Sequence, residues 1–534
     1  MARVQLPLLL MCALALHEGV QATAGLEWPW DRDAFRNIAQ AQTAADGGWL
    51  SDPFFLDESA FYNPLLAWLV GALSRWLGQP AHVVYTAAGP YVDLLGPLSF
   101  YLLVARWFGG AVAVAGTFHL LFLNVRPGAS GEPFWANPTY SPWALAANLG
   151  QPLFCLCLVA LARAAATRRR CWFASSGALL GLTFLAHTAP AALLGTVALL
   201  DTLRASWKER SARPLSDLGI LAACAVVVAS PLLFSIVGRY HLRVLNAAPF
   251  EWRWLPSWRT ASRILPQQLS VFSLLALPGL ALLAWRPAPR IARRHAVLLL
   301  LTAAFFFATP FVEQHLGWRP LRVLQVVSQH HFWFYLRLLE SVFVGFFLAV
   351  VTGVAGRALL RAGHVERRRY RLFATILSTV VVLAGLWVVY PSYRQRVSFK
   401  VGRNARQAIT RNDRDAERTR LVAWMRRETG PREVFLASDR VALLVVGPAG
   451  RKTLVLDANF VSQYVDLGPR EYARAALLRL LREGRREEAR RIAKRRNVGY
   501  LVLWTRDRFP QGDAAAALLQ PVYESRYYRV FRIG

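Results

Sequence analysis

The sequence predicts an α-helical polytopic membrane protein that ends in a small α/β domain. Three observations predict this class. Runs of about 20 apolar residues recur before Tyr390, and 55% of all residues are hydrophobic. Clusters of Arg and Lys separate many of these runs, as they do in the loops between membrane spans. After Tyr390 the apolar runs become short and alternate with polar, helix-like segments, which is typical of a soluble α/β domain.

The net charge of +31 favours a membrane surface over nucleic acid as the partner. In a soluble chain this charge would suggest nucleic-acid binding. Here the basic residues gather in short loops between apolar runs, where they act as topology signals. Their other partners would be anionic lipid headgroups or a phosphorylated substrate. None of the five cysteines lies in the long polar segments, so the sequence offers neither a disulfide framework nor a zinc site.

Hydropathy and length predict about eleven membrane spans. The opening segment resembles a cleavable signal peptide, but we interpret it as a retained span because the later charge pattern then falls into phase. The predicted spans are residues 4–24, 82–105, 109–125, 142–166, 172–186, 188–203, 216–237, 264–285, 295–311, 332–355 and 372–391.

Four basic loops set the predicted topology. They lie at residues 168–170, 204–213, 286–294 and 357–371, and each falls between spans on the same side of the membrane. The positive-inside rule makes that side cytoplasmic. The N-terminus is then cytoplasmic, and everything after Tyr390 lies on the extracytoplasmic side of the plasma or inner membrane.

Two long regions are predicted on the extracytoplasmic side. The first, residues 25–80, belongs to a membrane domain of residues 1–391, and its apolar stretch 65–77 is too short to span, so we expect a helix at the membrane interface. The second, residues 392–534, is the predicted α/β domain, which serves as a lid or acceptor-recognition module or, alternatively, as a scaffold. Within it we expect helices at 415–427 and 470–496, and strands at 433–437, 454–457, 500–504 and 527–532.

The first outside region opens with Glu27-Trp28-Pro29-Trp30-Asp31-Arg32-Asp33, which holds the candidate catalytic residues. Carboxylates where a span meets water are costly and usually functional. The neighbouring Trp side chains favour the level of the lipid headgroups. At this level Asp31 would act as general base on an acceptor hydroxyl, with Asp33 as the second candidate. The alternative is a structural ion pair with Arg32 or Arg36.

This arrangement resembles the GT-C superfamily of membrane glycosyltransferases. The resemblance rests on a first span, an outside loop that opens with Trp30-Asp31-Arg32-Asp33, and the turn-rich Asp52-Pro53-Phe54-Phe55 and Tyr62-Asn63-Pro64 before the interfacial helix. It implies an acidic residue that activates the acceptor, for which Asp31 is the best match. It also implies a polyprenyl-phosphate sugar donor held by a basic side chain. The sequence departs from the mannosyltransferase members, since it lacks an Asp-Glu pair at that first position.

Four residues are candidates for binding the donor phosphate. Arg337 lies inside a predicted span, where a phosphate would offset the cost of burying a guanidinium. Its alternative is a pair with Glu340 three residues later. Arg319 and Arg322 follow in the preceding loop, and His187 lies at the outside end of a hairpin between two spans.

Four further residues are candidates for binding the acceptor: Asp57, Glu58, Tyr62 and Trp254. The Asp57-Glu58 pair is expected to cap the helix that begins near Pro64, and a divalent metal is its less favoured ligand. No cofactor is otherwise expected. The predicted protein is thus a glycosyltransferase acting on a lipid, glycan or protein acceptor. Its alternatives are a transporter or flippase and a non-catalytic assembly protein for envelope glycans.

Overall fold

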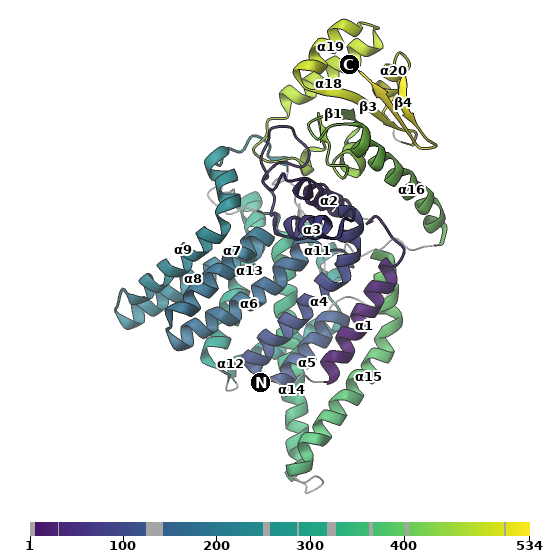
Figure 1. The fold of residues 1–534 in the computed structure, drawn as a ribbon. Coiled ribbons are helices and arrows are strands. Elements are labelled where there is room, and N and C mark those ends of the chain that lie inside the picture. Colours follow the sequence, from purple (N-terminus) through teal and green to yellow (C-terminus); the bar gives the residue numbers. More distant parts are fainter. Residues whose placement is uncertain are drawn as a thin grey trace. The chain divides into compact units, whose positions relative to one another are not determined.

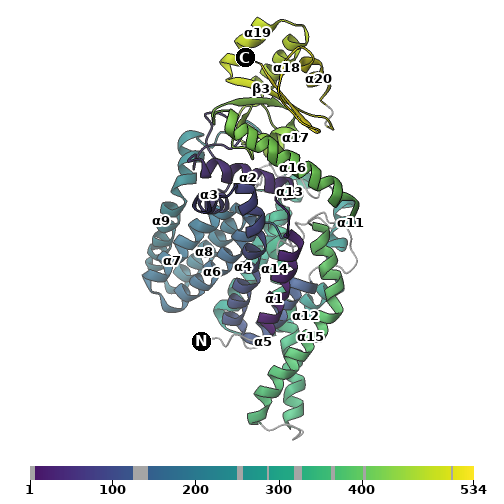
Figure 2. The ribbon, with the colours of Figure 1, turned by 45° about the vertical axis from the view of Figure 1, so that its right-hand side comes forward.

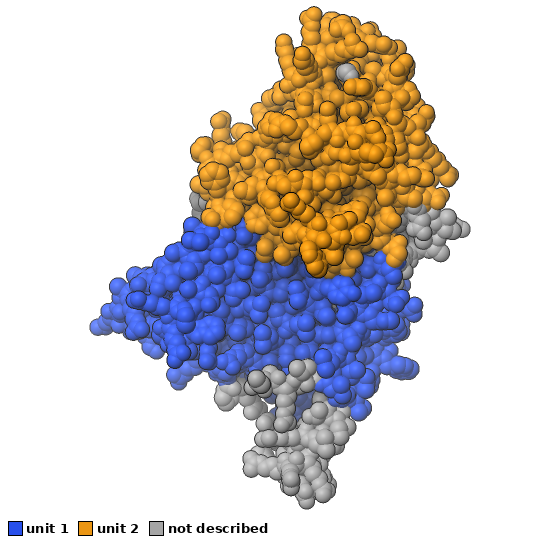
Figure 3. Space-filling model, viewed as in Figure 1, with its two compact units in different colours: residues 1–24, 89–229, 253–401 blue, residues 25–88, 230–252, 402–534 orange. Residues whose placement is uncertain are grey.

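The computed structural model describes residues 6–29, 31–123, 142–248, 257–285, 288–317, 327–361, 367–400, 405–506 and 509–533. The chain forms two compact units, coloured separately in Figure 3. Unit 1 comprises residues 1–24, 89–229 and 253–401, and unit 2 comprises residues 25–88, 230–252 and 402–534.

Unit 1 is built from long helices. Helices α6, α7 and α8 pack together, α5, α12 and α13 pack against α14, and α1 lies along α15 in both ribbon views (Figures 1 and 2). The elements are α1 (Leu6–Thr23), α4 (Ala81–Phe108, shared with unit 2), α5 (Gly110–Phe118), the π-helical turn η1 (His119–Leu123), α6 (Ala146–Thr167), α7 (Arg170–Ala186), α8 (Thr188–Glu209), α9 (Arg213–Leu233, shared), α11 (Trp258–Gln268), the 3₁₀ turn η5 (Val271–Leu275), α12 (Ala276–Trp285), α13 (Arg290–Leu316), α14 (His330–Arg361) and α15 (Arg367–Lys400).

Six helices in the described part of the chain are long and apolar enough to cross a membrane, or seven if the bent pair 258–266 and 271–285 forms one span. The chain is therefore a helical membrane protein, but the predicted count of about eleven spans is not confirmed. Two predicted spans show why. Helix α8 is apolar only in its first half, since its second half carries Asp201, Arg204 and Lys208. The predicted span 109–125 is split between the nine residues of α5 and the π-helical turn η1.

Unit 2 assembles three separate stretches of the chain. The first contributes α2 (Arg32–Ala45) and α3 (Leu65–Leu77), the second contributes the π-helical turn η4 (Phe234–Arg239), and the third contributes the remaining elements. These are α16 (Ala405–Glu428), β1 (Val434–Ala437), α17 (Asp439–Val441), η7 (Ala442–Val446), β2 (Lys452–Thr453), η8 (Ala458–Phe460), α18 (Gly468–Arg482), α19 (Arg486–Arg495), β3 (Val498–Trp504), α20 (Pro510–Ala516), β4 (Pro521–Glu524) and β5 (Tyr528–Arg532).

Helix α3 has the predicted bounds and packs on α2. Gly71 permits the close approach, because a Cβ there would lie 2.7 Å from the carbonyl oxygen of Ala41. The other face of α3 exposes an apolar stripe at helical spacing, from Leu69 to Leu77, in which Trp76 is 80% exposed. The helix begins after Pro64 with no side-chain cap, so the predicted capping by Asp57 and Glu58 is wrong.

A five-stranded mixed sheet lies in unit 2, in the order β2-β1-β3-β5-β4. Strand β1 pairs in parallel with β2 and β3, and β5 pairs antiparallel with β3 and β4. Apolar side chains of α18, α19 and α20 form the core against it. The predicted strand at 454–457 is wrong, since the strand there is Lys452–Thr453, and β4 was not predicted.

The compact units divide the chain differently from the predicted boundary between residues 391 and 392. The segment from Gly25 to Ala88 packs with the C-terminal stretch rather than with the helices that flank it in sequence. The backbone N–H of Thr453 in β2, for example, donates to the carbonyl oxygen of Phe54 over 2.7 Å. The loop and the sheet are thus parts of one structure.

Candidate functional site

The candidate catalytic carboxylates lie at the start of α2, and each has a different role there. Asp31 is the N-cap residue, with φ −80° and ψ 137°, and its carboxylate accepts from the backbone N–H of Asp33 over 2.7 Å. Asp33 instead forms an ion pair with Arg36 one turn later, at 3.2 Å. The ion-pair alternative therefore applies to Asp33. Among the described residues, no ion pair engages the Asp31 carboxylate.

Aromatic rings and charges of unit 2 surround the first turn of α2. The Arg36 guanidinium lies over the ring of Tyr62, 3.7 Å from its centre, and the side-chain amide of Gln40 donates to the Tyr62 carbonyl oxygen. Arg32 forms an ion pair with Asp457 at 3.1 Å and lies over the ring of Phe460. Tyr62 and residues 457–460 thus lie beside the start of α2. The sequence did not single out residues 457–460, and the predicted role of Tyr62 in binding the acceptor stays a prediction.

Electrostatics suit Asp31 to proton transfer. The side chain is half-buried, and desolvation together with the negative charge of Asp33 raises the pKa of Asp31 to about 7. Hydrogen bonds from the backbone and the charge of Arg36 act in the opposite direction. A carboxylate with this pKa is a stronger base than an ordinary aspartate and is still deprotonated in a large fraction of molecules at neutral pH.

The segment before α2 is held by α16. Trp28 is fully buried, and its indole N–H donates to the hydroxyl of Thr419 over 2.9 Å. Its ring stacks on His82 with 3.9 Å between centres, and the Arg418 guanidinium lies 5.1 Å from it. The Trp28 ring is therefore enclosed by protein, and the headgroup level predicted for this stretch stays a prediction.

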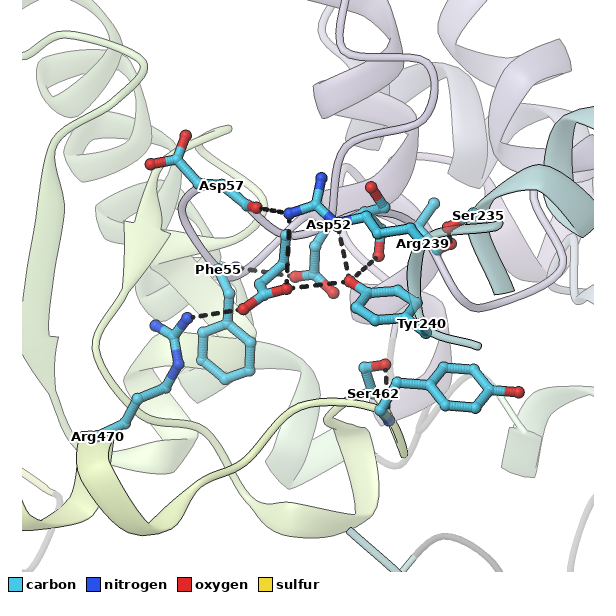
Figure 4. A network of polar contacts seen from close by, with 12 residues as sticks. Asp52, Phe55, Asp57, Ser235, Arg239, Tyr240, Ser462 and Arg470 are labelled. Atoms are coloured by element: carbon cyan, nitrogen blue, oxygen red, sulfur yellow. Dashed lines mark hydrogen bonds and ion pairs between the residues drawn. The ribbon is translucent and has the colours of Figure 1, made fainter. Parts of the chain in front are cut away.

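Asp57 and Glu58 belong to a polar network within unit 2 (Figure 4). Glu58 accepts from the hydroxyl of Tyr240 at 3.1 Å and forms an ion pair with Arg470 at 3.3 Å. The Asp57 carboxylate pairs with Arg432 at 3.0 Å. Arg432 thus engages Asp57, whereas Arg470 and the Tyr240 hydroxyl engage Glu58. Because the two carboxylates face different partners, the pair does not fit the predicted alternative of a divalent metal site.

A second buried contact fixes the loop next to this network. Asp52 is 1% exposed, and its carboxylate accepts from the backbone N–H groups of Phe54 and Phe55, each over 2.8 Å. The ammonium group of Lys452 donates to the Asp52 carbonyl oxygen. Burial raises the pKa of the Asp52 carboxyl and lowers that of Lys452, and the attraction between the two charges opposes both shifts.

In unit 1, His187 joins α7 to α8, as the hairpin prediction required, and is buried. Its Nε2 lies 3.1 Å from Nδ1 of His331, whose ring centre is 4.0 Å from that of His330. Two histidines from the start of α14 therefore lie beside the predicted one. The sequence contained a signal for them, namely the adjacent His330-His331, but no indication of which element they would face.

Arg337 lies in α14 and is 2% exposed. It forms an ion pair with Glu340, which the sequence offered as the alternative to phosphate binding. It also donates to the hydroxyl of Ser273 over 3.2 Å. Glu340 in turn lies 3.5 Å from His119. The guanidinium is thus part of a buried polar cluster, and its predicted role in binding phosphate stays a prediction.

Three predicted site residues, Arg319, Arg322 and Trp254, lie outside the described residues. Their roles therefore stay predictions. Within the described ranges, no three His, Cys, Asp or Glu side chains gather closely enough to hold a metal ion.

No protein-family model matches the chain, and no curated protein matches its sequence. Solved structures do match it. ArnT from Cupriavidus metallidurans, bound to undecaprenyl phosphate, superimposes with a TM-score of 0.56 at 14% identity, over 98% of each chain. The oligosaccharyltransferase of Archaeoglobus fulgidus, tethered to an acceptor peptide, gives a TM-score of 0.54 at 12% identity, over 96% of this chain and 70% of its own.

A further structure of that archaeal enzyme, AglB in complex with an inhibitory peptide and a dolichol-phosphate, gives a TM-score of 0.52 at 13% identity, over 96% of this chain and 71% of its own. At these identities the comparisons establish the fold. Both neighbours are GT-C glycosyltransferases, so the chain has the GT-C fold and the predicted resemblance is confirmed.

Proposed function

We propose that the chain is a membrane glycosyltransferase that moves a sugar from a polyprenyl-phosphate donor to a hydroxyl group of a cell-envelope acceptor. Asp31 is its general base, and the reaction takes place on the extracytoplasmic face of the membrane. The observation that carries the proposal is a half-buried carboxylate at the start of α2, outside any ion pair among the described residues, in a chain of GT-C fold.

The proposed reaction is one inverting displacement. Asp31 accepts the proton of the acceptor hydroxyl while that oxygen attacks the anomeric carbon of the sugar. The bond between that carbon and the phosphate oxygen breaks, and the lipid phosphate leaves with the electron pair. Since a phosphate needs little protonation to leave, a single base suffices. General-base assistance is typically worth about 10²–10⁴-fold in rate.

The donor class is supported by what the structural neighbours bind. ArnT was solved with undecaprenyl phosphate and AglB with a dolichol-phosphate, both of them polyprenyl phosphates. For the phosphate we retain the predicted residues Arg337, Arg319, Arg322 and His187 as candidates. Arg337 already has Glu340 as a partner, so its substitution tests stability as well as binding.

The acceptor side is proposed to lie around Tyr62, whose ring packs under Arg36 of α2. Asp57 and Glu58 are proposed to hold the loop in place and not to contact the acceptor directly. Asp57 pairs with Arg432, and Glu58 pairs with Arg470 and accepts from Tyr240. The acceptor itself, whether a lipid, a glycan or a protein, is identified by the assay below.

The test is sugar transfer in membranes that contain wild type, Asp31→Asn or Asp33→Asn, with radiolabelled polyprenyl-phosphate sugars as donors. Asn caps a helix about as well as Asp, so Asp31→Asn preserves α2 and removes only the base. We expect Asp31→Asn to lose about 10²–10⁴-fold of the activity at unchanged protein level. Equal transfer by all three would discard Asp31 and Asp33 as the base. No transfer by wild type from any donor would favour the transporter or assembly protein.

A further inference from the structure

A cavity of about 240 Å³ lies in unit 1, well away from His187. Residues of α6, α7, α8, α9 and α13 line it. Helices α7 and α8 form a hairpin with His187 at its closed end, whereas the cavity lies at the open end, near Arg168 and Glu209. Arg204 is 17 residues after His187 along α8, which corresponds to roughly 25 Å of helix.

One wall of the cavity is apolar, and its rim is charged. Leu161, Phe173, Val197 and Leu221 provide the apolar wall. The mouth is marked by the exposed side chains of Arg204 and Lys208, which stand one helical turn apart on α8. An apolar wall beneath a charged mouth matches a ligand that is itself part apolar and part charged.

The acidic residues of the cavity are already neutralised. Asp201 accepts from Arg294 over 2.9 Å and lies 3.4 Å from Nε2 of His295. Glu209 forms an ion pair with Arg168. Within the described part of the chain, neither Arg204 nor Lys208 has a carboxylate partner, so the mouth carries two uncompensated positive charges.

The surroundings of the mouth fit the surface of a membrane. Trp207, between the two cations, is 85% exposed, and Trp side chains favour the boundary between lipid and water. Arg169 and Arg170 are exposed nearby, in a loop that the positive-inside rule assigns to the cytoplasm. The cytoplasmic leaflet is rich in anionic lipids, which attract such basic clusters.

We propose that this cavity binds the phosphate headgroup of an anionic membrane lipid, with Arg204 and Lys208 on the phosphate and an acyl chain along the apolar wall. Arg offers a planar fork and Lys a point charge, and both are common phosphate ligands. The bound lipid would bridge α8 to α6, α9 and α13. This site is separate from the proposed transfer reaction, since it holds a structural lipid and no sugar donor.

The experiment measures lipid retention by the purified full-length chain in detergent, by native mass spectrometry. Phosphatidylglycerol is titrated against wild type and against Arg204→Gln/Lys208→Gln, with phosphatidylcholine as the neutral lipid. The matched control is Arg210→Gln/Arg213→Gln, which removes the same charge from exposed positions that do not line the cavity. The charge-preserving variant Arg204→Lys/Lys208→Arg completes the set.

We expect one phosphatidylglycerol on wild type, about tenfold weaker binding by the Gln pair, and a change of less than about threefold in the control and charge-preserving variants. Equal loss in the control pair, or none in the cavity pair, would overturn the site. Inorganic phosphate is added as a competitor. If it displaces the lipid at equal concentration, the ligand is a soluble phosphate and the assignment to a lipid is wrong. Because binding is read without any sugar donor, failure here leaves the transferase proposal untouched.

Discussion

Asp31 combines a structural and a proposed chemical role in one carboxylate. As the N-cap it satisfies a backbone N–H that the first turn of α2 would otherwise leave unpaired. As the proposed base it needs a raised pKa, which desolvation and the adjacent Asp33 provide. Asn can replace it in the first role but not in the second. The variant Asp31→Asn therefore separates the capping role from the catalytic role.

The raised pKa predicts that Asp31 destabilises the folded protein at neutral and alkaline pH. The folded carboxyl titrates at about 7 and the unfolded one at about 4, so folding stability is lost as the pH rises between these values. Asp31→Asn removes that charge and keeps the cap. The melting temperature of the variant, relative to wild type, should therefore be higher at pH 8 than at pH 4. A difference that is the same at both pH values would show that the Asp31 pKa is not raised.

Asp52 is predicted to matter for stability and not for proton transfer. Asp52→Ala leaves the buried N–H groups of Phe54 and Phe55 without an acceptor and removes the charge that faces Lys452. We expect a loss of about 2–4 kcal/mol, measured by thermal unfolding of the purified protein. Asp466→Ala is the control, because its carboxylate makes the same kind of bond, to the N–H of Gly468, at an exposed position. A comparable loss in both variants would contradict the role of burial.

At the scale of elements, the position of α2 depends on its packing against α3. Gly71 lies at a close contact between the two helices, and the opposite stripe of α3, which includes Leu69 and Trp76, is exposed and apolar. An exposed stripe of this kind fits the interfacial helix predicted from the length of the segment. The helix that carries Asp31 is therefore supported by a second helix whose free face suits a lipid surface.

Gly71→Val should displace α2 and lower both stability and transfer. The added side chain would clash with the backbone of α2 at Ala41, which cannot rotate away, and overpacking of this kind costs about 1–3 kcal/mol. Ala72→Val, one residue along on the exposed face, is the control. Thermal unfolding and sugar transfer are measured for both. Wild-type values for Gly71→Val would show that the close contact does not position the site.

Local patterns in the sequence predicted elements well and contacts between distant residues poorly. The apolar run 65–77 gave α3 its exact bounds, because helix limits follow from neighbouring residues. The run 454–457 is as apolar as a strand, yet the strand falls at Lys452–Thr453, where β1 provides the hydrogen bonds. The sequence also singled out Asp31 and Asp33, whose catalytic role stays a prediction. It could not reveal that Asp457 would meet Arg32, since 425 residues separate them.

At the scale of the whole molecule, unit 2 is held together by contacts among its three chain segments. Tyr240, from the middle segment, bonds to Glu58 and Ser59 of the first, and its ring stacks on Tyr464 of the third with 5.2 Å between centres. Glu58 continues to Arg470 of the third segment. The C-terminal stretch and the loop that carries the candidate site therefore belong to one compact unit.

Tyr240→Phe should loosen the loop that contains Glu58. The variant keeps the stacked ring but leaves the N–H of Ser59 without the hydroxyl that accepts its hydrogen bond over 2.8 Å. We expect faster hydrogen–deuterium exchange in residues 55–61 and a loss of about 1–3 kcal/mol in stability. Tyr472→Phe is the control, since Tyr472 is 77% exposed. Unchanged exchange in the Tyr240 variant would mean that the three segments are joined by other contacts.

The role of Asp31 as general base is tested most directly by the pH dependence of kcat/KM for sugar transfer by wild type, Asp31→Glu and Asp31→Asn. A general base must be deprotonated, so wild-type activity should rise with pH and level off above about 7. Asp31→Glu should keep a rising limb at a shifted pH, and Asp31→Asn should lose the limb together with about 10²–10⁴-fold of the rate. A wild-type profile in Asp31→Asn would show that Asp31 is not the base.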